Sequence, residues 1–458
     1  IVDTSCEGSP TEIRGWVVDP DLDESAVRFQ FANGYCAGDP EIVVRQDDIA
    51  GATRLGAISD PPLIPAPRPR AAAENGVTID WFMPDRLRVE GGSFPLSDAP
   101  GAAVIYPEML LYEHELPAAS PLEAEFRVIF DARDPAGPAA CEDAQYRWVI
   151  AGEGTTIDRE SGCRTEALLG EGSYTVTADP VGRAAASDEI QIEVEEHLIV
   201  ALGDSDGSGE GNAPFRDDGS ACNRSDAAGQ VRAAQRLEFQ DRRSTVTLLH
   251  MSCTGGRLAL QPRAELGDGN HRSVPWQVER AAELLGGRQI DAAMISAGAN
   301  DLGFAKVLTK CILEDCRETA LELDGIYKNL DLPAAQRGVD DVVAARVKEL
   351  RPRFADMPAL IEPLDPSAVL LTEYFDPSRD EDGEFCNRAG LGILRDEAEF
   401  AFEHVVAPLN EMVADGVAAA GESDRPGREW VYVEGIAEQF SGHGYCAQPS
   451  DQQWVVDA

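Results

Sequence analysis

A serine and a histidine in this chain have the residue types of a nucleophile and its base. Ser205 lies in GDSDGSG, directly after the aliphatic run LIVAL, and His443 lies far downstream in GHGYC. A serine hydroxyl becomes a good nucleophile when a base lies within hydrogen-bond reach. A lone Gly-Asp-Ser triplet is also common in turns and helix caps, so residues on other segments must decide between these interpretations.

Two further segments offer hydrogen-bond donors. CTGG places Gly255 where a backbone N–H can approach a substrate closely, which glycine allows because it lacks a side chain. GAND supplies the carboxamide of Asn300. The tetrahedral intermediate of acyl transfer is stabilised by preorganised donors of this kind. We therefore expect Gly255, Asn300 and the N–H of Ser205 to form an oxyanion hole.

These residues follow predicted strands of a parallel sheet. Near-continuous apolar runs predict strands at residues 198–202, 245–251, 290–297, 368–373 and 430–434. Helical spacing predicts intervening helices, one over 226–237 capped by Ser225 or Asp226 and one that bends at Pro408. Parallel strands joined by helices are covered on both faces, and ligands bind at their carboxyl ends. The sequence thus predicts an α/β fold with its site at that edge.

The chain changes character near residue 196. Upstream, short alternating apolar and polar runs are separated by Pro, Gly and Asp turns, which is typical of β-sheet domains. Residues 120–196 show strands at the spacing of a β-sandwich. Residues 1–119 are also β-rich, and within them 61–76 has the proline-dense, polar composition of a linker. We expect three regions, 1–119, 120–196 and 197–458.

The four motifs, in this order from residue 197 to about 455, resemble those of SGNH (GDSL-type) hydrolases. CNRS at 222–225 and Trp454 are similar to the secreted, disulfide-bonded bacterial lipase and esterase branch. The resemblance implies a flavodoxin-like, five-stranded parallel sheet flanked by helices, preceded by β-sandwich modules. It also implies that Ser205 is the nucleophile, that His443 is general base and then acid, and that Gly255 and Asn300 donate to the oxyanion.

Residues 120–196 resemble PKD-type, immunoglobulin-like domains. The resemblance lies in FDA, YRWVI and GEGSYTVTADP. Such modules act as spacers or as binding accessories in exported enzymes. It therefore implies either no ligand for this region or contact with a cell surface or a polysaccharide through the N-terminal β modules.

One position departs from the family pattern. The family often has an aspartate three residues before the histidine, and this chain has Phe440 there. The imidazole needs a partner on its other nitrogen to fix its tautomer. A backbone carbonyl near Phe440 or the carboxylate of Glu438 can take this role, and the sequence leaves both open. We expect Asp204 and Asp301 to bond backbone amides of their own turns.

The ten cysteines are even in number, widely dispersed and without a CxxC pair. This pattern favours disulfides formed in an oxidising compartment over zinc or redox motifs. We expect sequential pairing: 6 with 36, 141 with 163, 222 with 253, 311 with 316, and 386 with 446. The third and fifth bonds would fix loops that carry Gly255 and His443.

Charge restricts the partners. Lys+Arg number 39 and Asp+Glu 82, giving a net charge of −43, whereas nucleic acids and anionic membranes require a basic face. We therefore expect no nucleic acid partner. No apolar run approaches the roughly 18 residues of a transmembrane segment. The missing leader and the cysteines suit a mature secreted protein, so we expect an extracellular location with the signal peptide already removed.

Other motifs are weaker. DPSRDEDGEF at 376–385 resembles a calcium loop in its oxygen spacing but lacks the bidentate glutamate. His250 lies inside an apolar strand and should be packed in the core. Residues 303–340, which contain Cys311 and Cys316, could form a rim over the site or an ordinary surface insertion. We expect no cofactor and no metal.

The sequence therefore predicts a secreted serine ester hydrolase, an esterase or lipase, that forms an acyl-enzyme on Ser205. Its substrate would be a lipid, a small ester or an acylated carbohydrate. The alternatives are a carbohydrate esterase or acyltransferase on the same scaffold, because a fold does not fix the acyl group or its acceptor. A catalytically silent surface or binding protein is the remaining alternative.

Overall fold

The computed structural model gives two compact units, which are described separately. The first comprises residues 1–110, 123–196 and 235–246, and the second comprises 111–122, 197–234 and 247–458. The residues described are 77–84, 86, 124–133, 144–182, 187–212, 215, 222–258, 273–313, 315–323, 327, 330–388, 394–449 and 453, with the short strands β1 (Val27–Arg28), β2 (Val43–Val44), β4 (Val104–Ile105) and β5 (Leu110–Tyr112). The expected linker 61–76, Cys6, Cys36, Cys141 and Trp454 lie outside them.

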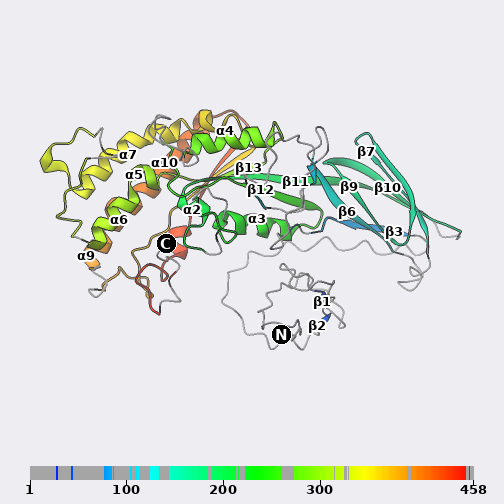
Figure 1. Ribbon diagram of the computed structural model, residues 1–458, viewed down its shortest axis with the longest axis horizontal. Coiled ribbons are helices and arrows are strands. Elements are labelled where there is room, and N and C mark those ends of the chain that lie inside the picture. The colour runs from blue at the N-terminus through cyan, green and yellow to red at the C-terminus, as the bar shows by residue number, and fades with distance from the viewer. Residues whose placement is uncertain are drawn as a thin grey trace. The chain divides into compact units, whose positions relative to one another are not determined.

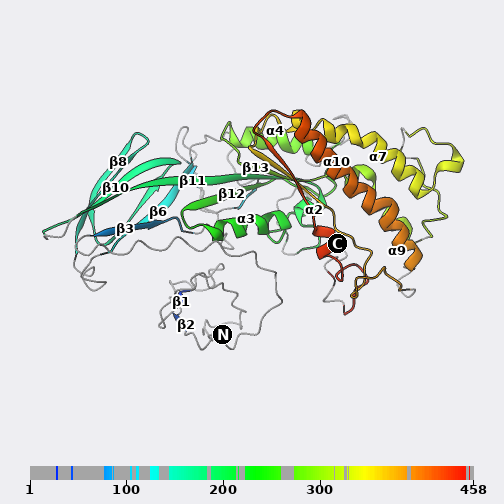
Figure 2. The same ribbon diagram turned by 180° about the vertical axis from the view of Figure 1, so that it is seen from behind.

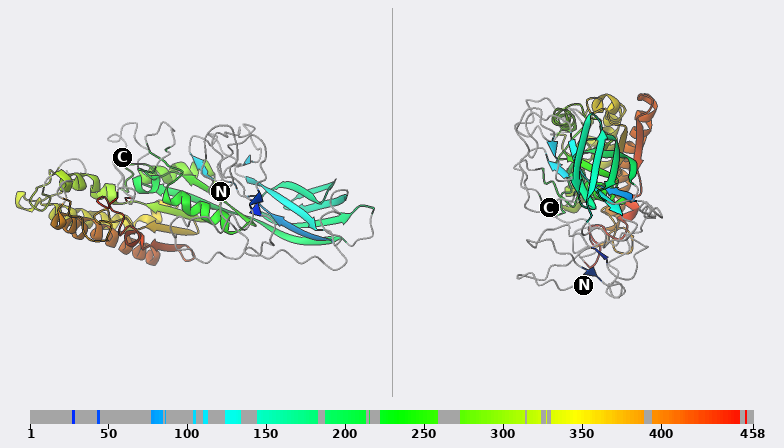
Figure 3. Two further views of the ribbon diagram at one scale, coloured as in Figure 1. Left: turned by 90° about the horizontal axis from the view of Figure 1, so that it is seen from below. Right: turned by 90° about the vertical axis from the view of Figure 1, so that its right-hand side faces the viewer.

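The first unit contains two sheets of mainly antiparallel strands. One sheet pairs β6 (Ala124–Arg133) with β3 (Thr78–Phe82) and β9 (Arg164–Leu169), and β4 lies parallel to β6. The other has the order β11-β10-β7-β8. Its strands are β7 (Tyr146–Gly152), β8 (Thr155–Ser161), β10 (Gly172–Pro180) and β11 (Asp188–Gly203). The right-hand view of Figure 3 shows the strands of this unit facing the viewer.

Aromatic side chains form the core of the first unit. Alternate residues of β6 and β7 are buried, so each strand turns one face inward, as the period of two requires. The rings of Phe130 and Trp148, from different sheets, lie 6.3 Å apart. The indole N–H of Trp148 donates to the Gly162 carbonyl at 3.1 Å, which satisfies its buried polar atom.

The sheet of the second unit has the strand order β5-β12-β11-β13-β14-β15, so β5 lies beyond the five strands that were expected. The strands at all five predicted positions are present: β11, β12 (Ser244–His250), β13 (Ala292–Ser296), β14 (Ala368–Thr372) and β15 (Glu429–Val433). The pairings of β11 with β13, β13 with β14 and β14 with β15 are parallel. The strand predicted at 198–202 is the last part of β11, which begins earlier than expected and runs without interruption from Asp188 to Gly203.

Helices cover both faces of this sheet. Figures 1 and 2 show α4, α7 and α10 on one side of the strands and α2 and α3 on the other. The helices are α2 (Ser205–Ser208), α3 (Gly229–Gln240), α4 (Val274–Leu285), α5 (Ala299–Leu302), α6 (Phe304–Leu313), α7 (Val339–Ala355), α8 (Met357–Ile361), α9 (Arg395–Ala401), α10 (Ala407–Ser423) and α11 (Ile436–Gln439), with a short 3₁₀ turn η5 (Ala334–Gln336). The chain is therefore a mixed α/β protein.

Two helices differ in detail from the expectation. The helix expected from residue 226 begins at Gly229, because the Ser225 hydroxyl accepts from Ala227 N–H in a turn before it. The bend expected at Pro408 is a π-helical turn, η7 (Phe402–Val406), between α9 and α10. Proline lacks an N–H and clashes with the carbonyl four residues earlier, and a wider turn before it relieves both problems.

The carboxyl end of β11 is held by a buried glutamine. The Gln277 side chain of α4 accepts from Gly203 N–H at 2.7 Å and donates to Gly203 O at 2.8 Å. Gly203 has φ +130°, and a Cβ there would lie 2.9 Å from the Ser296 nitrogen. No larger residue fits, so the backbones at the ends of β11 and β13 are in van der Waals contact. This contact fixes the position of the residues that follow Gly203.

We expect Gln277→Glu to make the stability of the protein strongly pH-dependent. A protonated carboxyl can still accept from Gly203 N–H and donate to Gly203 O, whereas an ionised carboxylate cannot donate and faces the carbonyl. The folded-state pKa of the new carboxyl is therefore raised, and the stability difference from wild type should grow as pH rises above about 4. Denaturant unfolding at several pH values measures it. Gln277→Leu removes the acceptor of the Gly203 N–H, while Gly203 O keeps its bond from Cys253 N–H, so this variant should lose about 1–3 kcal/mol at every pH. Equal pH profiles for the two variants would contradict the pairing of Gln277 with Gly203.

Candidate active site

Ser205 opens a short helix at the carboxyl end of β11. Asp204 is the N-cap of α2, and its side chain accepts from Asp206 N–H at 3.2 Å. Within α2 the Ser205 carbonyl accepts from the Ser208 hydroxyl at 3.0 Å. Ser205 is half-buried, whereas Asp204 beside it is fully buried. The serine is therefore presented at the edge of the sheet while its neighbour anchors the turn.

The loop after β12 packs directly onto this turn. Cys253 N–H donates to Gly203 O at 3.0 Å, and a Cβ on Gly256 would lie 3.0 Å from the Asp204 Cα. Gly255 has φ +79°, a left-handed conformation that other residues rarely adopt. The two glycines thus allow the backbone of this loop to approach the serine turn more closely than side chains would permit.

Asn300 joins the same edge from β13. It is the second residue of α5, and its Nδ2 donates to the Gly256 carbonyl at 3.2 Å. The structure therefore brings the segments of Ser205, Gly255 and Asn300 into direct contact at the carboxyl ends of β11, β12 and β13.

A cluster of polar groups connects the serine turn to Ser296 at the end of β13 and to Tyr374 after β14. The Ser296 hydroxyl is 3.0 Å from Asp204 Oδ1 and 3.1 Å from Asp206 Oδ2, and the Tyr374 hydroxyl donates to Asp204 Oδ2 at 2.6 Å. Burial, with a smaller contribution from the charge of Asp206, raises the pKa of Asp204 to about 7 even though these hydrogen bonds lower it. Burial likewise raises the pKa of Asp206 to about 6.

His443 lies in a turn after α11. Its backbone N–H donates to the Phe440 carbonyl at 2.8 Å, and the Phe440 ring stacks on Phe375 with centroids 4.8 Å apart. Tyr445 N–H donates to the Pro377 carbonyl at 2.9 Å. The histidine turn is therefore attached to the segment after β14, and that segment also carries the Tyr374 that bonds Asp204.

Glu438 is one of the two candidates for orienting His443. Glu438 is exposed, and its backbone carbonyl accepts from Ser441 N–H at 3.0 Å. At the start of α11, Ala437 N–H donates to the Glu373 carboxylate at 3.0 Å. These bonds position the main chain before the histidine.

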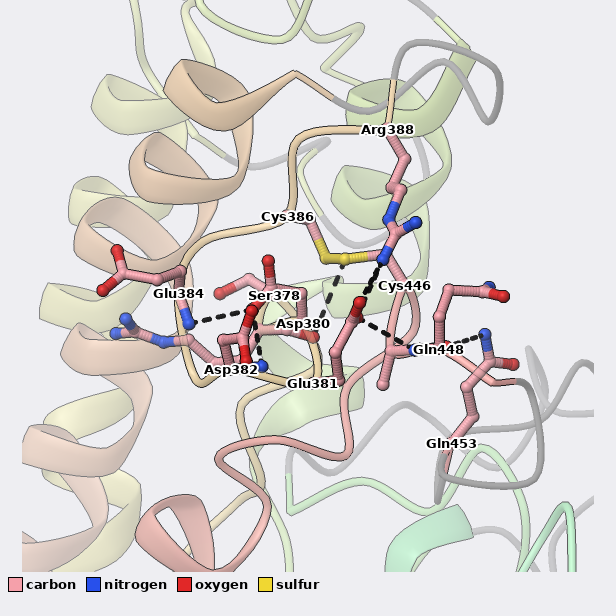
Figure 4. The surroundings of a disulfide bond; sticks show 12 residues. Ser378, Asp380, Glu381, Asp382, Glu384, Cys386, Arg388, Cys446, Gln448 and Gln453 are labelled. Atoms are coloured by element: carbon pink, nitrogen blue, oxygen red, sulfur yellow. Dashed lines mark hydrogen bonds and ion pairs between the residues drawn. A yellow bond between two sulfur atoms is a disulfide. The ribbon is translucent and has the colours of Figure 1, made fainter.

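The acidic loop considered as a calcium site is organised by its own amides. Asp376 Oδ1 accepts from Ser378 N–H at 2.9 Å, and Asp380 Oδ1 accepts from the N–H groups of Asp382 at 3.1 Å and Glu384 at 3.0 Å. Figure 4 shows this loop beside the Cys386–Cys446 bond. Among the described residues, no group of three or more His, Cys, Asp or Glu side chains could hold a metal ion.

Three of the five expected disulfides are confirmed. They join Cys222 to Cys253, Cys311 to Cys316, and Cys386 to Cys446. The other two expected pairs include cysteines outside the described residues. None of the helices described above combines the length and the hydrophobicity that a membrane span requires.

The structure tests two further expectations. His250 is fully buried and its Nε2 lies 3.0 Å from the Gly207 carbonyl, so the prediction of a core histidine is confirmed. Asp204 bonds an amide of its own turn, as expected. For Asp301 the structure shows a bond beyond its own turn: its buried carboxylate accepts from Leu258 N–H at 2.8 Å in the loop after β12. Its role is to hold that loop against α5.

Sequence reasoning missed several residues that support the site. Asp206, Ser296 and Tyr374 complete the cluster around Asp204. Buried Arg224 donates to the carbonyls of Ser252 at 2.9 Å and Met251 at 3.2 Å. The available signal was a polar residue at the end of an otherwise apolar strand, as in MIS before Ala297 and LLTEY before Phe375.

Comparisons with known proteins give only distant similarity. No protein-family model matches the chain, and no curated protein matches it. A phospholipase A1 from Streptomyces albidoflavus is 20% identical with a TM-score of 0.38, over 57% of this chain and 87% of its own. An extracellular lipase from Streptomyces rimosus is 18% identical with a TM-score of 0.31 over the same shares. A carbohydrate acetylesterase from Xanthomonas citri is 11% identical with a TM-score of 0.22, over 71% of this chain and 66% of its own. The function is therefore argued from the local geometry.

We expect the double variant Cys386→Ser/Cys446→Ser to lose about 4 kcal/mol of stability, because the bond closes a long loop in the unfolded chain. The cysteines are 60 residues apart in sequence. Denaturant unfolding of wild type and variant, both under oxidising conditions, measures the difference. The matched control is Cys311→Ser/Cys316→Ser, whose cysteines are separated by only 5 residues and whose removal should cost less. Equal losses would contradict this explanation.

We expect Asp206→Asn to flatten the pH dependence of stability. Asp204 and Asp206 have raised folded-state pKa values of about 7 and about 6, so the stability they contribute is fully present below pH 4 and is lost as pH rises to about 7. The variant removes one of these groups and lowers the pKa of the other by removing a neighbouring charge. Relative to wild type, it should gain stability between pH 4 and pH 7. A constant difference in unfolding free energy between variant and wild type across this range would contradict the raised pKa values of Asp204 and Asp206.

Proposed function

We propose that this chain is a serine ester hydrolase of the SGNH (GDSL) type, in which Ser205 attacks the ester carbonyl and carries the acyl group. The supporting observation is the bond from the Asn300 carboxamide to the Gly256 carbonyl, together with the packing of Gly256 on the Ser205 turn. These contacts gather an alcohol and backbone and side-chain amide donors at one sheet edge. A reacting carbonyl needs both within about 3 Å.

In the proposed reaction, His443 takes the hydroxyl proton of Ser205 as the serine oxygen bonds to the ester carbon. The N–H groups of Ser205 and Gly255 and the Asn300 carboxamide stabilise the resulting oxyanion. His443 then gives the proton to the leaving alkoxide, which departs as the alcohol. Water, deprotonated by His443, attacks the acyl-enzyme and releases the acid, restoring the Ser205 hydroxyl. No metal or cofactor takes part.

For the second imidazole nitrogen of His443 we favour the backbone carbonyl near Phe440 over Glu438. The Phe440 carbonyl already accepts one bond from His443 N–H, which keeps it beside the histidine, and a carbonyl oxygen has a second lone pair to offer. Glu438 is exposed, so its carboxylate would have to give up hydration to serve this role. The proposed site is thus a Ser-His dyad with a main-chain acceptor.

The wider organisation belongs to the same proposal. The strand order β12-β11-β13-β14-β15 supports a flavodoxin-like catalytic domain over residues 197–458. The contact between Phe130 and Trp148 of different sheets supports a β-sandwich of the PKD or immunoglobulin-like type over 120–196. The disulfides support a secreted protein, because such bonds persist in oxidising compartments. We retain 1–119 as a separate β-rich region.

We expect Ser205→Ala and His443→Ala each to abolish ester cleavage while leaving the fold intact, because each removes a group that takes part in covalent chemistry. Asn300→Ala should lower kcat by roughly 10² to 10³, the usual cost of losing one oxyanion donor. The measurement is turnover of a short-chain aryl ester, a phospholipid and an acetylated polysaccharide by the wild type and the variants. The substrate profile also distinguishes a lipase from a carbohydrate esterase.

Matched controls come from the same unit. Ser423 and His404 lie on α10 and η7, and Ser423→Ala and His404→Ala should retain wild-type turnover. Labelling of the wild type, but not Ser205→Ala, by a fluorophosphonate probe identifies the nucleophile directly. Near-normal turnover by Ser205→Ala or His443→Ala, or a wild type that neither cleaves esters nor takes up the probe, would refute the assignment.

A further inference from the structure

The Tyr374 hydroxyl lies between the two sides of the candidate site. It donates to Asp204 Oδ2 at 2.6 Å and accepts from Ala299 N–H at 3.2 Å. Asp204 directly precedes Ser205, and Ala299 directly precedes Asn300. One phenol oxygen therefore joins the residue before the nucleophile to the residue before the amide donor.

The position of Tyr374 is itself fixed from a helix. The Asn410 side chain of α10 accepts from Tyr374 N–H at 2.9 Å and donates to the Tyr374 carbonyl at 2.9 Å. This pairing replaces the sheet hydrogen bonds that end with β14 at Thr372. Tyr374 is 6% exposed, so little solvent competes for its bonds. The phenol is thus held at both its backbone and its ring end.

We propose that Tyr374 is a positioning residue for ester cleavage: its hydroxyl sets the separation between the Ser205 turn and the Asn300 turn. The inference rests on the proposed function and adds to it a residue outside the four motifs. Tyr374 would touch neither substrate nor reacting atoms. It acts through Asp204, whose other oxygen caps the helix of Ser205, and through the first amide of α5.

Removing the hydroxyl disturbs both sides at once. Without it, a buried carboxylate oxygen loses a donor and a buried amide loses its acceptor, and each must find water or move. The two turns would then separate or rotate, and a displacement of about 1 Å in such a constellation costs on the order of 10²-fold in rate. Because substrate binding does not depend on the phenol, the loss should fall on kcat.

The test is Tyr374→Phe, which keeps the ring and removes only the hydroxyl. We expect kcat for a short-chain aryl ester to fall roughly 10- to 100-fold with KM changed by less than about twofold. The matched control is Tyr327→Phe. Tyr327 is also fully buried, and its hydroxyl donates to the Leu302 carbonyl of α5 at 2.8 Å, away from Asp204. That variant should lose stability while keeping kcat within about twofold.

A measurement without substrate tests the Tyr374–Asp204 bond itself. The groups facing Asp204 are Asp206 of α2, Ser296 at the end of β13 and Tyr374. A phenol donor favours the ionised carboxylate, so its loss raises the folded-state pKa of Asp204. The stability gap between wild type and Tyr374→Phe should therefore be larger above pH 7 than below pH 5, whereas the gap for Tyr327→Phe should not change with pH.

The outcomes separate the possibilities. An unchanged kcat in Tyr374→Phe, or an equal fall in Tyr327→Phe, overturns the positioning role. If Tyr374→Phe does not fold, the test is made with Asn410→Ala, which removes the side chain that holds the Tyr374 backbone but leaves the Tyr374 hydroxyl in place. Asn410→Ala should lower kcat several-fold without raising KM. An unchanged kcat in this variant overturns the proposal. A wild type without ester cleavage refutes the proposed function, and the positioning role with it, even where the pH-dependent stability gap is present.

Discussion

The buried carboxylate of Asp204 is the constraint on which the arrangement of the site depends. In the described part of the chain its partners are two hydroxyls and an amide N–H, rather than a cation. A fully buried carboxylate is tolerated only when its oxygens are hydrogen-bonded, since desolvation costs several kcal/mol. Its donors come from the ends of β11, β13 and β14. Satisfying one carboxylate therefore fixes three strand ends relative to one another, and the presented serine follows from that geometry.

The strands of the second unit could be predicted because the apolar residues that bury each strand are consecutive in the sequence. Val200, Leu248 and Ile295 lie in apolar runs, and a strand covered on both faces needs nothing else. The continuity of β11 could not be predicted in this way. In the sequence, the polar residues Glu196 and His197 indicate the end of one strand and the start of another. In the structure, Glu196 lies within the continuous strand and is only 3% exposed. Its Oε1 lies 4.0 Å from the guanidinium of Arg86, a residue remote in sequence, and a local pattern does not indicate that contact.

The same distinction applies to the candidate site. Short sequence motifs identify four residues of the candidate site: Ser205, Gly255, Asn300 and His443. Gln277, Ser296 and Tyr374 cannot be identified in this way, because each bonds residues that are far away in the sequence. Their bonds to Gly203 and Asp204 span 74, 92 and 170 residues. Asp301 illustrates the same point: its carboxylate accepts from Leu258 N–H, 43 residues away, and nothing in the local sequence indicates that partner.

The serine and histidine sides of the site are stabilised by different physical means. The serine turn depends on buried groups that titrate, because Asp204 and Asp206 have pKa values raised to about 7 and about 6. The histidine turn depends on aromatic stacking, main-chain bonds to the segment after β14 and the Cys386–Cys446 bond, none of which changes its protonation near neutral pH. Proton concentration should therefore act first on the serine side. Reduction of the disulfides should act on both sides, because Cys222–Cys253 holds the loop of Gly255 and Cys386–Cys446 joins the segment after β14 to the segment after His443. Because Tyr374 follows β14 as Phe375 and Pro377 do, the same short segment is in contact with both sides and connects them.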